Sequence, residues 1–303
     1  MGDIHVKTEF VRFFTDDNVE LQGLYFAPSS TPARAGVLHV HGLAGTFYEN
    51  RFVDYVAKML VDRGYAFLTF NNRGHDYMAD LLKKEDAAWT YLDGGGAYEV
   101  FADCVYDIDA ALQFLQHQGV VDVCLLGHSS GANKVVFYQS RRKNEDVQSV
   151  ILLSPNDDVG LHRHAVGEDF EELLQTARGM VEESKGDHLM PEGSFFAYPI
   201  SANTYLAFFG PESKRDTFPF RNPQAEFEEL STIACPLLIL FGNVNEYVLQ
   251  DLDETLALLE RKANASSRVD TGIIDGAPHT YLGREEELST VIAKWLDDVM
   301  PVR

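Results

Sequence analysis

The chain has 303 residues, 45% of them hydrophobic, and its 25 Lys and Arg against 47 Asp and Glu give a formal net charge of −22. This length and apolar fraction suit a single α/β domain that carries an insertion. A surface with so much negative charge repels phosphate groups, which argues against a nucleic acid or a membrane as partner.

The first ten residues, MGDIHVKTEF, lack the basic and apolar regions of a secretory signal. Nor does any apolar run approach the roughly 20 residues that span a bilayer. The cysteines are odd in number and lie in apolar stretches, which is typical of reduced, buried thiols (Cys104, Cys124 and Cys235). We therefore expect a cytoplasmic protein.

Three strands are predicted at the start of the chain, and turn residues at 16–18 and 29–32 separate them. Short turns of this kind favour an antiparallel start. The predicted strands cover residues 9–15, 19–26 and 35–40.

Strands and helices then alternate, which predicts a parallel sheet with helices on both faces. The expected order is helix 50–63, strand 66–70, helix 98–116, strand 121–126, helix 129–141 and strand 149–153. After an interruption it continues with strand 236–241, helix 249–262, strand 268–274 and helix 285–300.

The interruption covers residues 155–232. Apolar residues recur there at helical spacing over 170–181, and an aromatic-rich irregular stretch follows. We expect this segment to be an inserted cap, so that residues 1–154 and 233–303 together form the core domain.

The sequence Gly127-His128-Ser129-Ser130-Gly131 directly follows a predicted strand and precedes a predicted helix. This is the context of a nucleophile elbow, in which a serine is held on a tight strand-to-helix turn with its Oγ exposed. A glycine-rich turn with a helix-capping serine is the structural alternative. We expect Ser129 to be a nucleophile.

A serine nucleophile needs a base and donors for the oxyanion. His279 follows the last predicted strand, which is the third position in the order serine, acid, histidine. The backbone N–H of Ser130 and that of Leu43, in His41-Gly42-Leu43-Ala44-Gly45 after the third strand, are the expected donors.

Four motifs occur in this order: HGLAG (41–45), NNRGHDY (71–77), GHSSG (127–131) and GAPHTY (276–281). Because of these four motifs, the chain resembles the α/β-hydrolase superfamily from end to end. In particular it resembles the capped serine esterases of the feruloyl-esterase-like and siderophore-esterase-like kind. The resemblance implies an eight-stranded, mostly parallel sheet with helices on both faces and a helical cap inserted after the sixth strand. It also implies acyl transfer to water without a metal or an organic cofactor.

The chain departs from the pattern at the triad acid. The superfamily sequence there resembles G-x-x-D-E-Y-V, whereas this chain has Gly242-Asn243-Val244-Asn245-Glu246-Tyr247-Val248. Glu246, with its longer side chain, is our first choice as the partner of His279. Asn245, through its amide oxygen, and Asp157, after the sixth strand, are the alternatives.

These observations predict a serine hydrolase that cleaves a carboxylic ester of a small molecule through an acyl-enzyme. Aromatic residues of the insertion, with Trp89 and Tyr91 at the rim, favour a substrate with an apolar or aromatic part. His162 with His164, and Arg215, are expected to face solvent, the histidines without a metal. A thioester, lactone, amide or carbon–carbon bond hydrolase with the same triad is an alternative, as is a catalytically weak binding protein.

Overall fold

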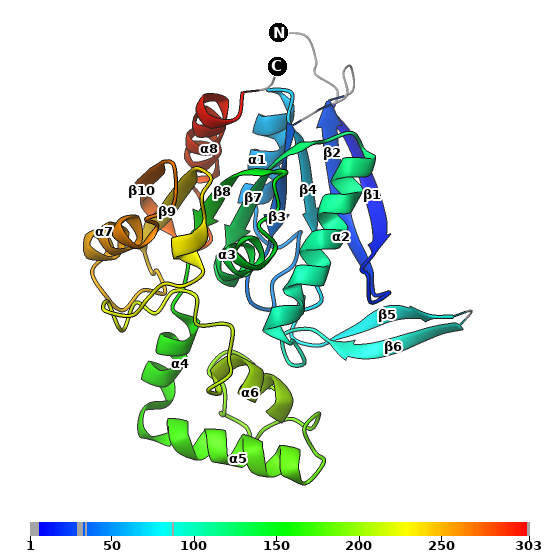
Figure 1. Cartoon of the computed structure of the whole chain (residues 1–303), viewed down its shortest axis with the longest axis vertical. Coiled ribbons are helices and arrows are strands. Elements are labelled where there is room, and N and C mark those ends of the chain that lie inside the picture. The colour runs from blue at the N-terminus through cyan, green and yellow to red at the C-terminus, as the bar shows by residue number, and fades with distance from the viewer. Residues whose placement is uncertain (1–5, 29–32, 34, 87, 302–303) are drawn as a thin grey trace.

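The computed structural model describes residues 6–28, 33, 35–86 and 88–301, and a single eight-stranded sheet runs through it (Figure 1). Its strands lie in the order β1-β2-β4-β3-β7-β8-β9-β10. Their bounds are β1 Val6–Phe14, β2 Glu20–Pro28, β3 Ala35–Val40, β4 Ala66–Phe70, β7 Asp122–His128, β8 Val147–Leu153, β9 Leu237–Val244 and β10 Val269–Pro278.

Within this sheet, β2 is the strand that runs in the direction opposite to all the others. It pairs antiparallel with both β1 and β4, and the pairs from β4 through β10 are parallel. The central strands β3 and β4 are buried at every residue, as expected for a sheet that is covered on both faces. The predicted antiparallel start and eight-stranded, mostly parallel sheet are confirmed. The turn predicted at 29–32 lies outside the described residues.

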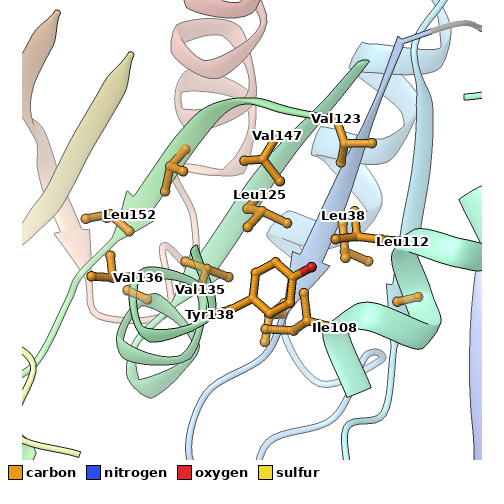
Figure 2. Packing of buried hydrophobic residues seen from close by; sticks show 14 of the residues in the cluster. Leu38, Ile108, Leu112, Val123, Leu125, Val135, Val136, Tyr138, Val147 and Leu152 are labelled. Atoms are coloured by element: carbon orange, nitrogen blue, oxygen red, sulfur yellow. The ribbon is translucent and has the colours of Figure 1, made fainter. Parts of the chain in front are cut away.

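Helices cover both faces of the sheet. One face packs against apolar residues of α2, α3 and α7, and the other against those of α1 and α8. Figure 2 shows the first face, where Leu125 of β7 and Leu152 of β8 pack near Val135 and Tyr138 of α3. The bounds of these helices are α1 Phe52–Val61, α2 Cys104–His117, α3 Ser130–Arg142, α7 Leu252–Lys262 and α8 Glu285–Val299.

Several predicted boundaries move by a few residues, and some elements were not predicted, among them α6 (Ala202–Phe209) in the stretch expected to be irregular. The helix expected from residue 98 begins at Cys104, after the 3-10 turn Phe101–Asp103. A hairpin of β5 (Ala79–Glu85) and β6 (Ala88–Gly94), which the sequence pattern does not predict, projects from the fold (Figure 1).

Between β8 and β9 the chain forms α4 (Asp158–Val166), α5 (Phe170–Glu182) and α6 (Ala202–Phe209), with 3-10 turns at Gly167–Asp169 and Leu230–Thr232. These helices lie beyond the carboxyl ends of the sheet strands (Figure 1), and their buried residues share one aromatic-rich cluster with Phe101, Cys104 and Phe137 of the core domain. Whether residues 155–232 form a separate domain stays a prediction. Across the described ranges, no helix combines the length and apolarity that a membrane span requires.

Candidate active site

The turn between β7 and α3 holds Ser129 in a strained backbone conformation. Its φ of 57° and ψ of −131° lie outside the regions that non-glycine residues ordinarily adopt. The residues on either side of the turn must be glycines, because neighbouring backbone leaves no room for a Cβ. A Cβ on Gly127 would overlap the backbone of Gly131, and a Cβ on Gly131 would overlap the carbonyl of Val40. The close approach of β7, α3 and β3 therefore lifts Ser129 onto the tip of the turn.

The loop after β3 lies against this turn, since a Cβ on Gly42 would be 2.8 Å from Ser129 Cβ. His41 braces the loop: its Nδ1 donates to the Gly42 carbonyl at 2.9 Å, and its Nε2 accepts from the Asn72 N–H at 3.1 Å. Burial lowers the pKa of His41 well below its ordinary value. The ring is therefore neutral at pH 7, as both of these hydrogen bonds require.

The two residues that are expected to donate to the oxyanion border the same cavity. Leu43 and Ser130 both line the cavity that contains Ser129. The hydrogen bonds among the described residues include none that is donated by the backbone N–H of either residue. Ser130 is the first residue of α3, where the helix leaves its N–H groups without partners.

His279 follows the end of β10 and is oriented by Glu246. Its Nδ1 lies 2.7 Å from Glu246 Oε2, and both side chains are nearly buried. The other carboxylate oxygen, Oε1, accepts from Ser154 Oγ and from the N–H of Gly242, each at 2.9 Å. Tyr281 packs against this group, since its hydroxyl lies 2.9 Å from both Ser154 Oγ and the carbonyl oxygen of Leu240. The Glu246 carboxylate is thus held on both of its oxygens.

Neither alternative acid contacts the imidazole. Asn245 is exposed, has a φ of 53°, and forms no hydrogen bond with His279 among the described residues. Asp157 caps α4, accepting from the N–H of Gly160, and pairs with Arg221 at 2.6 Å. The geometry therefore places Glu246, and not Asn245 or Asp157, against His279.

His128, beside the elbow serine, supports the backbone of His279. Its Nε2–H donates to the His279 carbonyl at 2.9 Å, and the two ring centroids are 5.0 Å apart. Burial, with a smaller contribution from the charge of His279, lowers the pKa of His128 well below its ordinary value. A neutral His128 thus fixes the loop that carries His279.

Ser129 and His279 open into the same cavity of about 240 Å³. Ser129 Oγ accepts a hydrogen bond from Asn156 Nδ2 at 2.9 Å. Among the described residues, no hydrogen bond joins Ser129 Oγ to His279. Besides the residues discussed above, the cavity is lined by Gly45, Glu49, Asn50, Asp158, Leu161, Phe196, Ala197, Tyr247 and Thr280.

Most aromatic residues of the insertion pack inside the fold and do not line this cavity. Phe196 lines it and is half exposed, whereas most of the others lie in the buried cluster that joins the insertion to the core domain. The expectation for Trp89 and Tyr91 was wrong. Both lie on the β5–β6 hairpin, where Trp89 packs against Phe14, and neither lines the cavity.

Two residues that were expected to face solvent are buried. His162, on α4, has its Nε2 2.9 Å from the Tyr205 hydroxyl and stacks on Phe209 with centroids 4.0 Å apart. Arg215 is 1% exposed and bonds Ser130 Oγ and Asp158, each at 2.8 Å. His162 is buried because aromatic side chains surround it in the fold. Arg215 is buried because it pairs with the nearly buried carboxylate of Asp158.

Sequence reasoning missed Asn156 and the pair of Asp158 with Arg215. Asn156 and Asp158 directly follow β8, at the sheet edge where the carboxyl ends of parallel strands meet, and this position was the available signal. The contact of Arg215 with Asp158 joins segments far apart in sequence and has no local signature. In the part of the chain that the structure covers, no group of three or more His, Cys, Asp or Glu is placed to hold a metal.

Residues 96–299 match the model of a family described as a protein of unknown function (DUF1749). A search of curated proteins finds no match. The structure is similar to the siderophore hydrolase EstB from Aspergillus fumigatus, at 18% identity and a TM-score of 0.69, over 97% of this chain and 98% of that one.

It is also similar to Est1E from Butyrivibrio proteoclasticus, solved with ferulic acid bound, at 16% identity and a TM-score of 0.64, over 96% of this chain and 99% of that one. The esterase Pf2001 from Pyrococcus furiosus matches at 19% identity and a TM-score of 0.59, over 97% of this chain and 92% of that one. At such identities the similarity concerns the fold. At that level it confirms the expected α/β-hydrolase fold.

Proposed function

We propose that this chain, which belongs to the DUF1749 family of unknown function and has the α/β-hydrolase fold, is a serine hydrolase that cleaves carboxylic esters. One observation carries the proposal. A strained serine, an imidazole bound to a buried carboxylate, and two residues whose backbone N–H groups have no acceptor among the described residues all border one cavity. Acyl transfer through a serine needs each of these parts.

In the proposed first half-reaction, His279 Nε2 takes the hydroxyl proton of Ser129 as Oγ forms a bond to the acyl carbon. The carbonyl electron pair moves onto oxygen, where the N–H groups of Leu43 and Ser130 stabilise the charge. The intermediate then expels the alcohol oxygen, which takes the proton from His279. An acyl-enzyme ester on Ser129 remains.

In the second half-reaction a water molecule replaces the alcohol. His279 takes a proton from the water as its oxygen attacks the acyl carbon, and it returns the proton to Ser129 Oγ as the acid leaves. Glu246 stabilises the imidazolium that forms twice per turnover. The short contact between Glu246 Oε2 and His279 Nδ1 supports this role.

The insertion acts in this proposal as a cap over the acyl or alcohol group. Leu161, Phe196 and Ala197 line the cavity from that segment, and Leu43 and Tyr247 line it from the core. A cavity of about 240 Å³ is smaller than most ligand pockets, so part of a larger substrate lies outside it. We infer an ester of a small molecule with an apolar or aromatic part, which contacts the exposed rings of Phe196 and Tyr247.

We also propose a cytoplasmic location. Cys104, Cys124 and Cys235 are free thiols, the first two buried and the third partly buried. Burial raises the pKa of the Cys235 thiol to about 11 and that of Cys124 to about 12. Unreactive reduced thiols are typical of proteins in a reducing compartment.

The test is the Ser129→Ala variant assayed with p-nitrophenyl acetate and p-nitrophenyl butyrate, and by labelling with a fluorophosphonate probe. We expect hydrolysis and labelling to be lost with thermal unfolding unchanged. Ser267→Ala, an exposed serine whose side chain makes no hydrogen bond among the described residues, is the matched control. Undiminished turnover in Ser129→Ala would refute the assignment.

A further inference from the structure

The hydroxyl of Ser129 is held by a side chain that the reaction described above does not use. Asn156 Nδ2 lies 2.9 Å from Ser129 Oγ, and among the described residues it provides the hydrogen bond that this oxygen makes. Asn156 is 5% exposed and lines the cavity of Ser129 and His279.

The direction of this bond determines where the serine proton points. An amide nitrogen donates and does not accept, so Ser129 Oγ is the acceptor and its own proton stays free. The reversed amide would place an oxygen against the hydroxyl and would bury two N–H donors in place of the one oxygen, Oδ1, that is now without a partner. The observed orientation therefore leaves the proton available to the imidazole.

The surrounding structure fixes Asn156 in place. Its carbonyl accepts a hydrogen bond at 3.0 Å from Nδ2 of Asn133, which is fully buried on α3. Ser154, two residues earlier, bonds Glu246, and Asp157, the next residue, caps α4. The same short segment after β8 thus contacts the acid that orients His279 and the nucleophile itself.

We propose that Asn156 is a further catalytic residue, whose N–H donor directs the Ser129 hydroxyl towards His279 and stabilises the negative charge that develops on Oγ during attack. The inference rests on the proposed serine hydrolase function. As the proton passes to His279, the bond from Asn156 becomes charge-assisted and strengthens, and such a gain accelerates the reaction because it is realised in the transition state.

Two substitutions separate this role from a structural one. Asn156→Ala removes the donor, and the lost hydrogen bond to a charged oxygen lowers kcat about 10- to 100-fold with little change in KM. Asn156→Asp keeps the shape but puts an acceptor beside the hydroxyl, which draws the proton away from His279. At pH 8 we expect Asn156→Asp to be slower than Asn156→Ala.

The pH dependence of the rate separates Asn156→Asp from Asn156→Ala more clearly than the rate at one pH. Burial raises the pKa of a carboxyl introduced at this position above its usual value of about 3.9. As the pH falls from 8 towards 5, the introduced carboxyl is protonated in a growing fraction of the Asn156→Asp molecules, and a protonated acid donates again. The rate of Asn156→Asp relative to wild type therefore rises on acidification, whereas that of Asn156→Ala stays constant.

The assay is p-nitrophenyl butyrate hydrolysis, with kcat and KM measured between pH 5 and 8, and with thermal unfolding as the check on folding. Asn264→Asp makes the same chemical change at an exposed turn and is the matched control. If Asn156→Ala fails to fold, the isosteric Asn156→Asp carries the test through its pH profile.

Wild-type or faster turnover in Asn156→Ala would overturn the inference, as would identical pH profiles of the two variants. The Ser129→Ala variant distinguishes this failure from a failure of the proposed function. If Ser129→Ala is inactive and the Asn156 variants are unimpaired, only the role of Asn156 is refuted. If Ser129→Ala retains full activity, the serine hydrolase assignment itself fails.

Discussion

The carboxylate of Glu246 lies 2.7 Å from Nδ1 of His279, although the superfamily pattern that the sequence resembles has its acid where this chain has Asn245. The backbone conformation explains why Glu246, and not Asn245, contacts His279. Asn245 adopts a φ of 53° and is exposed, so the chain turns there and the next residue enters the site. The longer side chain of Glu246 spans the remaining distance and is anchored by Ser154 and Gly242.

Replacing Glu246 with Gln is expected to lower kcat by orders of magnitude, towards the roughly 10⁴-fold loss seen when a serine-triad carboxylate becomes an amide. The amide removes the charge that stabilises the imidazolium. Asn245→Gly, which keeps the positive φ accessible, and Asp157→Asn should retain most of the activity. Steady-state kinetics of the three variants side by side is the measurement. A loss in Asp157→Asn as large as that in Glu246→Gln would contradict the geometry.

Replacing Gly131 with Ala is expected to destabilise the fold, because the new Cβ would overlap the Val40 carbonyl where α3 meets β3. Relief requires these two elements to separate, which costs roughly 1–3 kcal/mol or more. Gly179→Ala on α5 is the control, since nothing lies within 4 Å of a Cβ there. That change should stabilise by about 0.5–1 kcal/mol. Urea unfolding of both variants measures the difference. Equal stabilities would show that the elbow tolerates a side chain.

Acid should destabilise the insertion through His162. Burial lowers the pKa of His162 to about 4, from 6.5. The unfolded chain therefore binds the proton first, and stability is lost as the pH falls from about 6.5 towards 4. In His162→Phe this contribution is absent. We expect the loss in unfolding free energy between pH 7 and pH 5 to be smaller by about 2 kcal/mol in that variant.

Urea unfolding of wild type and His162→Phe at the two pH values gives this difference directly. The variant also leaves the Tyr205 hydroxyl without its partner, so the comparison is made between pH values within each protein. Equal losses of unfolding free energy between pH 7 and pH 5 in the two proteins would mean that His162 does not account for the acid sensitivity.

Local sequence patterns were sufficient to predict most strands and helices of the fold. The strands at 35–40 and 66–70 have the predicted bounds, because fully buried parallel strands are short apolar runs between turn residues. Ser129 and His279 were chosen from their place after strands β7 and β10, since the carboxyl ends of parallel strands meet at one edge. The β5–β6 hairpin was missed because its exposed, partly charged strands lack a buried face.

The choice among Glu246, Asn245 and Asp157 depended on tertiary structure. All three carry a suitable oxygen near the carboxyl ends of strands. The backbone turn at Asn245 and the engagement of Asp157 with Arg221 decide that Glu246 meets His279. The burial of Arg215 likewise depends on a partner, Asp158, that is distant in sequence. Periodicity and turn residues act locally, so they were enough to predict most strands and helices and to place Ser129 and His279 directly after strands. Which side chains touch was decided by the packing of segments that only the folded chain brings together.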